Sequence, residues 1–244
     1  MKKMLITIFT LVLVLPATQA FAARYKIEIT NLTNANFFTP ILVAAHRHDL
    51  DMFEAGESAS AAMQAIAEGG DITLMQTALD DGGAASSVAE APTTAPVLAP
   101  GETAVALVDA RGRNRLLSLA AMILPTNDAF IGLDAISLRR FSNRTVYLYG
   151  YDAGTEANDE LLNPGAGGVP GVPGIPGDPS GLAGTGGAGV SDSDFNETVH
   201  IHRGIVGDDD EFGGVSDLDR SAHRWQNPVA RVVITRVRGN YVLD

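Results

Sequence analysis

The 244-residue chain contains no cysteine, which excludes a disulfide scaffold and any zinc or iron–sulfur site with Cys ligands. Basic residues are also scarce: the chain has 17 Lys and Arg and 29 Asp and Glu, which gives a formal charge of −12. A broad attraction to nucleic acid or to anionic lipid requires a basic face. We therefore expect no nucleic-acid partner, and a cationic partner suits this charge better.

The signatures of several common enzyme classes are missing. The sequence has no Gly-x-Ser-x-Gly elbow, no phosphate-binding loop and no dinucleotide-binding glycine fingerprint. A conventional hydrolase, kinase or dehydrogenase is therefore not expected. We assign no catalytic residue and no residue that binds an organic cofactor.

Long apolar runs are missing after the first residues of the chain. Lys2 and Lys3 precede an apolar run from Met4 to Leu15, and Ala20-Phe21-Ala22 fits the small-x-small rule of signal peptidase. This pattern predicts a signal peptide over residues 1–22 and an exported protein, either periplasmic or secreted. The run is shorter than the roughly 20 residues that span a bilayer, so we expect no transmembrane segment.

The mature chain, residues 23–244, is expected to form one mainly β domain. Arg24–Asn31 alternates apolar and polar residues with the period of a half-buried strand. Further short segments rich in β-branched and aromatic residues predict strands at Thr103–Asp109, Arg115–Leu124, Ile131–Leu138, Thr145–Tyr151, Thr198–Arg203 and Val229–Val237. No long helical crossovers separate them, which favours an antiparallel β-sandwich over a parallel sheet. Two short helices are predicted, at Ser58–Glu68 and after Asp71.

Residues 163–191, which we call the Gly/Pro segment, have a distinct composition. Four Gly-x-Pro triplets lie within Gly168–Pro179, too few for a collagen helix, and the rest of the segment breaks the period. We expect a long extended loop between two strands. Since loop-closure entropy depends weakly on length, we expect a short linker to replace most of it with little loss of stability.

Acidic residues follow two of the predicted strands. If the three strands between residues 115 and 151 form a meander, the loop carrying Asp128 and the loop carrying Asp152 emerge at the same end of the sheet. Gly154 allows a sharp turn that brings Glu156 towards the same place. Three carboxylates repel one another unless a cation lies between them, and ligand sets made only of oxygen favour Ca²⁺. The pattern therefore predicts a site for a hard cation such as Ca²⁺ at Asp128, Asp152 and Glu156. The alternative is that these acidic loop residues are solvated surface.

Several segments resemble the spondin amino-terminal domain family. Residues 126–133 resemble a segment of that family in which serine, proline, aspartate and tryptophan precede valine-glycine-valine, and residues 151–156 resemble its tyrosine-aspartate-alanine-glycine-threonine-aspartate segment. The stretches 25–33, 38–40 and 225–230 fit the pattern of bacterial members. The resemblance extends from about Arg24 to about Val237.

The resemblance implies a β-sandwich like that of C2 domains, with one calcium ion bound by three acidic side chains that map onto Asp128, Asp152 and Glu156. It also implies extracellular recognition, since animal members belong to matrix and cell-surface proteins. The chain departs from them in having no cysteine, Ala129 in place of an aromatic residue, and Glu156 in place of an aspartate. We expect a calcium-binding module for adhesion or recognition whose ligand is a cell-surface, matrix or glycan component.

Two histidines support an alternative. On a strand, His200 and His202 share one face at a spacing found in zinc and copper sites. With a third ligand from His46, His48 or His223, the protein would be a transition-metal hydrolase or redox protein. The other interpretation is structural, with Val199 and Ile201 in the core and both histidines outside.

A further acidic patch comprises residues 208–211 together with Asp217 and Asp219. It lacks the ligand spacing and the glycine of an EF-hand loop. We expect a solvated acidic loop here rather than a second cation site.

Overall fold

The computed structural model describes residues 23–92, 96–138, 143–193 and 196–237. The predicted signal peptide, residues 1–22, lies outside the described residues. The strands are β1 (Ala23–Asn31), β2 (Phe37–Phe38), β3 (Leu42–His46), β4 (Ala85–Val88), β5 (Thr103–Ala110), β6 (Leu116–Leu124), β7 (Ala129–Ser137), β8 (Asn143–Asp152), β9 (His200–Ile201) and β10 (Ala230–Val237). The helices are α1 (Ala61–Gly69), α2 (Thr73–Asp81) and α3 (Arg220–His223).

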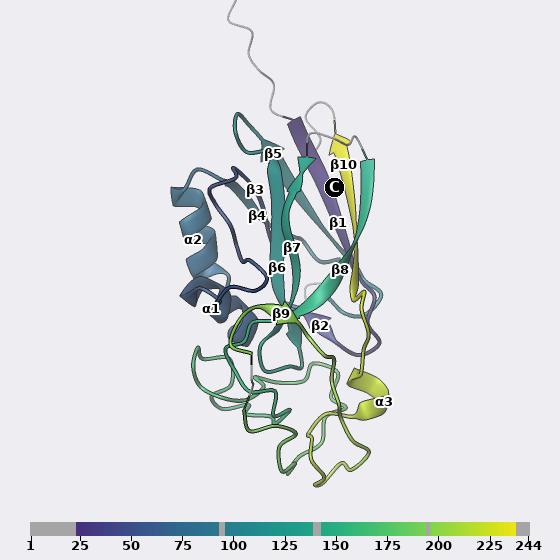
Figure 1. The fold of residues 1–244 in the computed structure, drawn as a ribbon. Helices are drawn as coiled ribbons and strands as arrows, with labels where there is room; N and C mark the ends of the chain where they lie inside the picture. Colours follow the sequence, from purple (N-terminus) through teal and green to yellow (C-terminus); the bar gives the residue numbers. More distant parts are fainter. Residues whose placement is uncertain (1–22, 93–95, 139–142, 194–195, 238–244) are drawn as a thin grey trace, which may run out of the picture.

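The strands form an antiparallel sheet that curls into a sandwich and nearly closes (Figure 1). Its order is β4-β3-β6-β7-β8-β10-β1-β5, with β2 paired to β6 and β9 paired to β8. A bridge between Glu90 and Val105 links the chain after β4 to β5, at the other end of this order. The predicted mainly β, antiparallel architecture is confirmed.

The main core lies between the two layers of the curled sheet. Inward-facing residues alternate along β1 and β10, where Ile27, Ile29, Val232 and Ile234 are almost completely buried. In β6, by contrast, all seven central residues are buried. One face of β6 packs in this core and the other face packs under the helices, so its alternation is lost.

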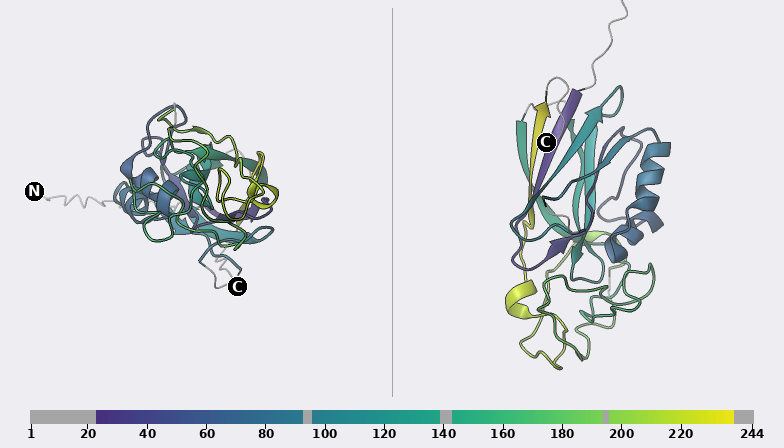
Figure 2. Two further views of the ribbon diagram at one scale, coloured as in Figure 1. Left: turned by 90° about the horizontal axis from the view of Figure 1, so that it is seen from below. Right: turned by 180° about the vertical axis from the view of Figure 1, so that it is seen from behind.

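Helices α1 and α2 cover the outer face of β3, β6 and β7 (Figures 1 and 2). Ser60 caps α1 by accepting a hydrogen bond from the Met63 N–H at 3.1 Å, and Gly70 ends the helix with a φ of 70°. Met63 and Ile66 are thereby directed at the sheet and are fully buried. No helix in the described ranges is long and apolar enough to cross a membrane.

Three strands lie in sequence for which no strand was predicted: β2, β3 and β4. β3 is buried along its whole length, so it lacks the alternation that marks a half-buried strand. The predicted strand Thr198–Arg203 is much shorter, since only His200 and Ile201 pair with β8. The chain turns away after these residues towards α3.

The Gly/Pro segment is a loop, as predicted, but it is not extended away from the domain. It folds with residues 196–219 over the end of the sandwich where β8 ends (Figure 2). Ile175 is fully buried in the main core, and its N–H donates to the Leu161 carbonyl oxygen at 2.9 Å. This packing argues against replacement of the segment by a short linker without loss of stability.

Candidate metal centre

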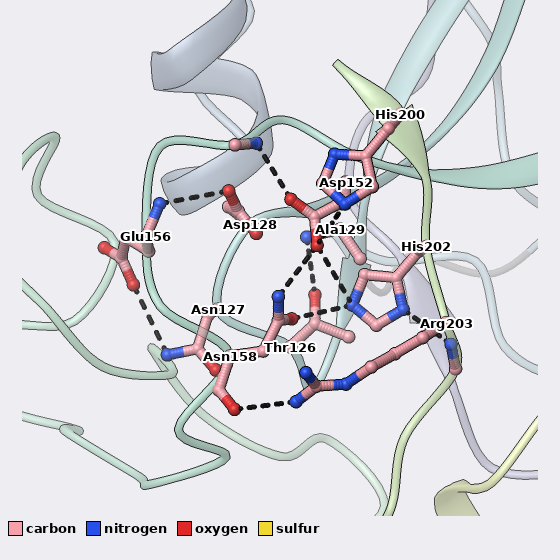
Figure 3. Close-up of polar contacts among 12 residues, drawn as sticks. Thr126, Asn127, Asp128, Ala129, Asp152, Glu156, Asn158, His200, His202 and Arg203 are labelled. Carbon is pink, nitrogen blue, oxygen red and sulfur yellow. Dashed lines mark hydrogen bonds and ion pairs between the residues drawn. The ribbon is translucent and has the colours of Figure 1, made fainter. Parts of the chain in front are cut away.

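The predicted meander is present, and it brings two acidic side chains together at one end of the sheet. β6, β7 and β8 pair in order, and Ala129, the first residue of β7, lies opposite Asp152, the last residue of β8. Asp128 directly precedes this pair and is fully buried, while Asp152 is 1% exposed. Figure 3 shows the two carboxylates side by side.

Asp128 fixes the loop that follows β8. Its Oδ2 atom accepts hydrogen bonds from the backbone N–H groups of Thr155 at 2.8 Å and Glu156 at 3.1 Å. Its Oδ1 atom is buried and has no hydrogen-bond partner. Burial and the nearby negative charge of Asp152 raise the pKa of Asp128, although the hydrogen bonds from the loop oppose the shift.

Asp152 is held at both of its oxygen atoms. Oδ1 accepts from the Gly154 N–H at 2.8 Å, and Oδ2 accepts from Asn158 Nδ2 at 2.7 Å. Gly154 has a φ of 68°, and a Cβ atom there would lie 2.7 Å from the backbone of Glu197. The sharp turn predicted at Gly154 is therefore present and needs glycine.

Glu156 lies in the same loop, but its carboxylate is turned away from the two aspartates and towards Asn127 (Figure 3). Its Oε2 atom accepts from Asn127 Nδ2 at 3.4 Å and from the Gly174 N–H at 3.2 Å. Its Oε1 atom is buried without a hydrogen-bond partner. Burial is the main cause that raises the pKa of Glu156, to about 8.

The three predicted ligands therefore share one loop cluster but do not surround a common point. Across the described ranges, no three His, Asp or Glu side chains are grouped closely enough to enclose a metal ion. The residues nevertheless fit a hard cation in two respects. The Asp128 and Asp152 carboxylates lie close enough for their charges to repel, and two buried carboxylate oxygens, Asp128 Oδ1 and Glu156 Oε1, lack hydrogen-bond donors.

His202 is buried, contrary to the interpretation that places both histidines outside. Its ring lies 5.2 Å from the Trp225 ring, centroid to centroid, and its Nδ1 atom accepts from the Gly204 N–H at 2.9 Å. The proton of the neutral ring is therefore on Nε2, which donates to Asn158 Oδ1 at 2.8 Å. Burial lowers the pKa of His202 to about 3. Ile201, which was expected in the core, is 51% exposed.

This arrangement gives His202 a positioning role. Both of its ring nitrogens form hydrogen bonds, so neither offers a lone pair to a metal. Asn158, which accepts from His202, in turn donates to Asp152. His200 donates from Nδ1 to the Thr198 carbonyl oxygen at 2.7 Å, and its Nε2 lies 3.8 Å from Asp152 Oδ2.

The other histidines considered as a third ligand lie in other surroundings. His46 contacts Ser118, His223 contacts Ser180 and Asp178, and the His48 side chain is 88% exposed.

The second acidic patch is only partly solvated. Asp209 and Asp210 are exposed, as predicted, but Asp217 is 6% exposed. Its two carboxylate oxygens accept from the N–H groups of Leu162 at 2.7 Å and Gly187 at 2.9 Å. Asp217 thus organises neighbouring loops.

Sequence reasoning missed the amide side chains of this centre. Asn127 links the loop before β7 to Glu156 and to Asp159, and Asn158 links Asp152 to His202. Asn127 lies directly before Asp128, a position that gave a weak indication of its role.

Comparisons with known proteins identify relatives of this chain. The model of the Spondin_N family matches residues 18–170, which is more than half of the chain. Spondin-2 of Homo sapiens is 27% identical over 139 residues, covering 54% of this chain and 42% of the relative. Spondin-2 of Rattus norvegicus is 27% identical over 167 residues, covering 61% of this chain and 50% of the relative. The chain therefore spans about half the length of these curated relatives.

Proposed function

We propose, on the premise that this chain belongs to the Spondin_N family, that it is an exported calcium-binding module for adhesion or recognition outside the cytoplasm. The observation that carries the proposal is that two buried carboxylate oxygens of this loop cluster, Asp128 Oδ1 and Glu156 Oε1, have no hydrogen-bond partner. Asp128, Asp152 and Glu156 would hold the ion. The ion would supply positive charge where the fold has gathered negative charge.

The role of the ion in this proposal is structural. Asp128 accepts from the loop that carries Glu156, so binding of calcium by these residues would stabilise the loops at this end of the sandwich. An open cleft of about 490 Å³ lies beside the site and is lined in part by Ser58, Thr155, Glu156 and Glu197. Its polar lining suits a cell-surface, matrix or glycan component as ligand.

The surroundings of His202 disfavour a catalytic role for a transition metal bound there. A transition-metal enzyme would need ring nitrogens with free lone pairs, and both nitrogens of His202 are engaged. Burial also lowers the pKa of His202 to about 3, so this histidine does not serve as a general base near neutral pH. We therefore propose that the protein binds its ligand without turnover.

Elemental analysis of the purified protein tests the proposal. We expect calcium at close to one equivalent after dialysis against millimolar calcium, and loss of that calcium in Asp152→Asn. Asp209→Asn is the matched control, because the Asp209 side chain is 67% exposed and pairs with Arg220. Zinc or copper at one equivalent, lost on His200→Ala and retained in Asp152→Asn, would contradict the proposal in favour of the transition-metal alternative.

A further inference from the structure

Strand β8 carries a row of tyrosines on the outer face of the sheet. Tyr147, Tyr149 and Tyr151 occupy alternate positions, so their side chains lie on one face of the strand. Leu148 is buried in the main core, which places the tyrosines on the opposite, outer face. Helices α1 and α2 cover the outer face of β3, β6 and β7 (Figure 1), and beyond them Tyr147 is 56% and Tyr149 is 50% exposed.

Tyr151 anchors one end of this row. Its ring lies 5.2 Å from the Phe53 ring and 5.5 Å from the Phe130 ring, centroid to centroid. Phe53 and Phe130 are buried, so these contacts tie the row to the core beneath the helices. β8 pairs with β7 at Tyr149 and with β10 at Tyr147, which holds the two exposed rings on a fixed backbone.

Three carboxylates border the row on the β7 side. Asp134 lies two residues after Gly132, which pairs with the middle tyrosine, so its side chain is on the same outer face. Burial and the negative charge of Asp51 raise the pKa of Asp134. His46 opposes this shift and Glu54 adds to it, so these groups lie close around Asp134. No ion pair within the described ranges involves the three carboxylates, so this border carries unpaired negative charge.

The other border of the row is basic. Arg231 on β10 is exposed and lies opposite Tyr147. Its guanidinium donates to Thr30 Oγ1 on β1 at 3.3 Å, in the direction away from β7. The negative charge therefore lies on the β7 side, beside the exposed tyrosines.

We propose that this tyrosine face, formed by Tyr147, Tyr149 and Asp134, binds an arginine-bearing segment of a partner protein. Guanidinium groups would stack on the two tyrosines and pair with Asp134. A guanidinium is planar, stacks on aromatic rings and forms forked hydrogen bonds with a carboxylate, so it matches both features of this face. Tyr151 and Asp152 point to opposite faces of β8. The inference therefore goes beyond the proposed function and does not require calcium.

NMR titration of the full chain in EDTA with an acetylated and amidated tetra-arginine peptide tests the proposal. We expect the largest shift changes at Tyr147, Tyr149 and Asp134. Tyr149→Ala should weaken binding about twofold to fivefold, the range for one cation–π contact at an exposed site, whereas Tyr149→Phe keeps the ring and should bind as tightly as the unmodified protein. Asp134→Asn should weaken binding and reduce its dependence on salt. Tetra-lysine should bind more weakly than tetra-arginine, because an ammonium group neither stacks nor forks.

Residues 208–212 provide the matched control, because they combine carboxylates with Phe212, which is 78% exposed. Phe212→Ala should leave the affinity for tetra-arginine unchanged. Shift changes centred on residues 208–212, or equal affinities for the two peptides, would overturn the inference. Shift changes at Tyr149 with chitohexaose and none with tetra-arginine would overturn it in favour of a glycan. Because EDTA is present throughout, each of these outcomes leaves the calcium proposal to its own test.

Discussion

The body of the sandwich and the loops at its end are held together by different interactions. In the body, apolar side chains such as Ile29 and Val232 are buried between hydrogen-bonded strands. In the loop end, which comprises residues 153–193 and 196–219, regular structure is sparse, and carboxylates accept hydrogen bonds from backbone N–H groups. The carboxylates that do so for loop-end amides are Glu68, Asp128, Asp152, Glu156, Asp159, Glu160, Asp178, Asp208, Asp210 and Asp217.

This difference explains part of the acidic composition. A glycine-rich loop exposes many N–H groups that no strand partner satisfies, and a buried carboxylate can satisfy two or three of them. Asp178 shows the principle, because it accepts from the N–H groups of Ser180, Leu182 and Ala183. Burial alone would raise the pKa of Asp178, but hydrogen bonds from His223, Ser180 and the loop backbone hold it well below its usual range.

The largest expected effect compares two buried isoleucines. Ile29→Ala in β1 should lower the free energy of unfolding by about 3–4 kcal/mol, because paired strands cannot close the cavity. Ile175→Ala in the Gly/Pro segment should cost about 1–2 kcal/mol, since a loop relaxes more readily. Urea unfolding of both variants measures the difference. Equal losses would show that the loop end is as rigid as the body.

The next effect concerns a carboxylate of the loop end. Asp217→Asn replaces one acceptor oxygen by an NH₂ group that faces a buried backbone N–H, so we expect a loss of about 1–3 kcal/mol in urea unfolding. Asp209→Asn, on the exposed part of the same acidic patch, should cost less than about 1 kcal/mol. Similar small losses in both variants would mean that Asp217 does not organise the loops.

A smaller effect is expected in the pH dependence of the metal-free protein. The folded state raises the pKa of Glu156 from 4.5 to about 8, so the folded state binds a proton more tightly than the unfolded state. The resulting stability is fully present below about pH 4.5 and is lost as the pH rises towards 8. Between pH 5 and 8, denaturant unfolding in EDTA should therefore show a free energy of unfolding that falls as the pH rises. The loss should be smaller in Glu156→Gln, where the raised pKa of Asp128 still contributes, and an equal slope in both proteins would assign the pH dependence to other groups.

The sequence predicted the body better than the loop end for a physical reason. The alternation in residues 24–31 reports burial of one face, and the structure has β1 there. In β3 and β6 both faces are buried, so periodicity carries no information, and β3 was missed. In the loop end the contacts join residues far apart in the chain, such as Glu68 and Gly171, and no local pattern marks them.

The candidate centre was predictable only in part. The meander placed Asp128 beside Asp152, because strand order alone fixes which loops meet. The direction of the Glu156 side chain depends on Gly174, which comes from the Gly/Pro segment, and the burial of His202 depends on Trp225. Neither contact follows from spacing along the chain.

Thermal unfolding in calcium and in EDTA tests the central claim most directly. In calcium at about 100 times its dissociation constant, the unmodified protein should gain about 2.7 kcal/mol, seen as a higher melting temperature than in EDTA. Asp128→Asn, which removes one of two adjacent buried carboxylates, should fold in EDTA and gain nothing from calcium. Identical melting curves of the unmodified protein in calcium and EDTA, or a full calcium response in Asp128→Asn, would contradict the account.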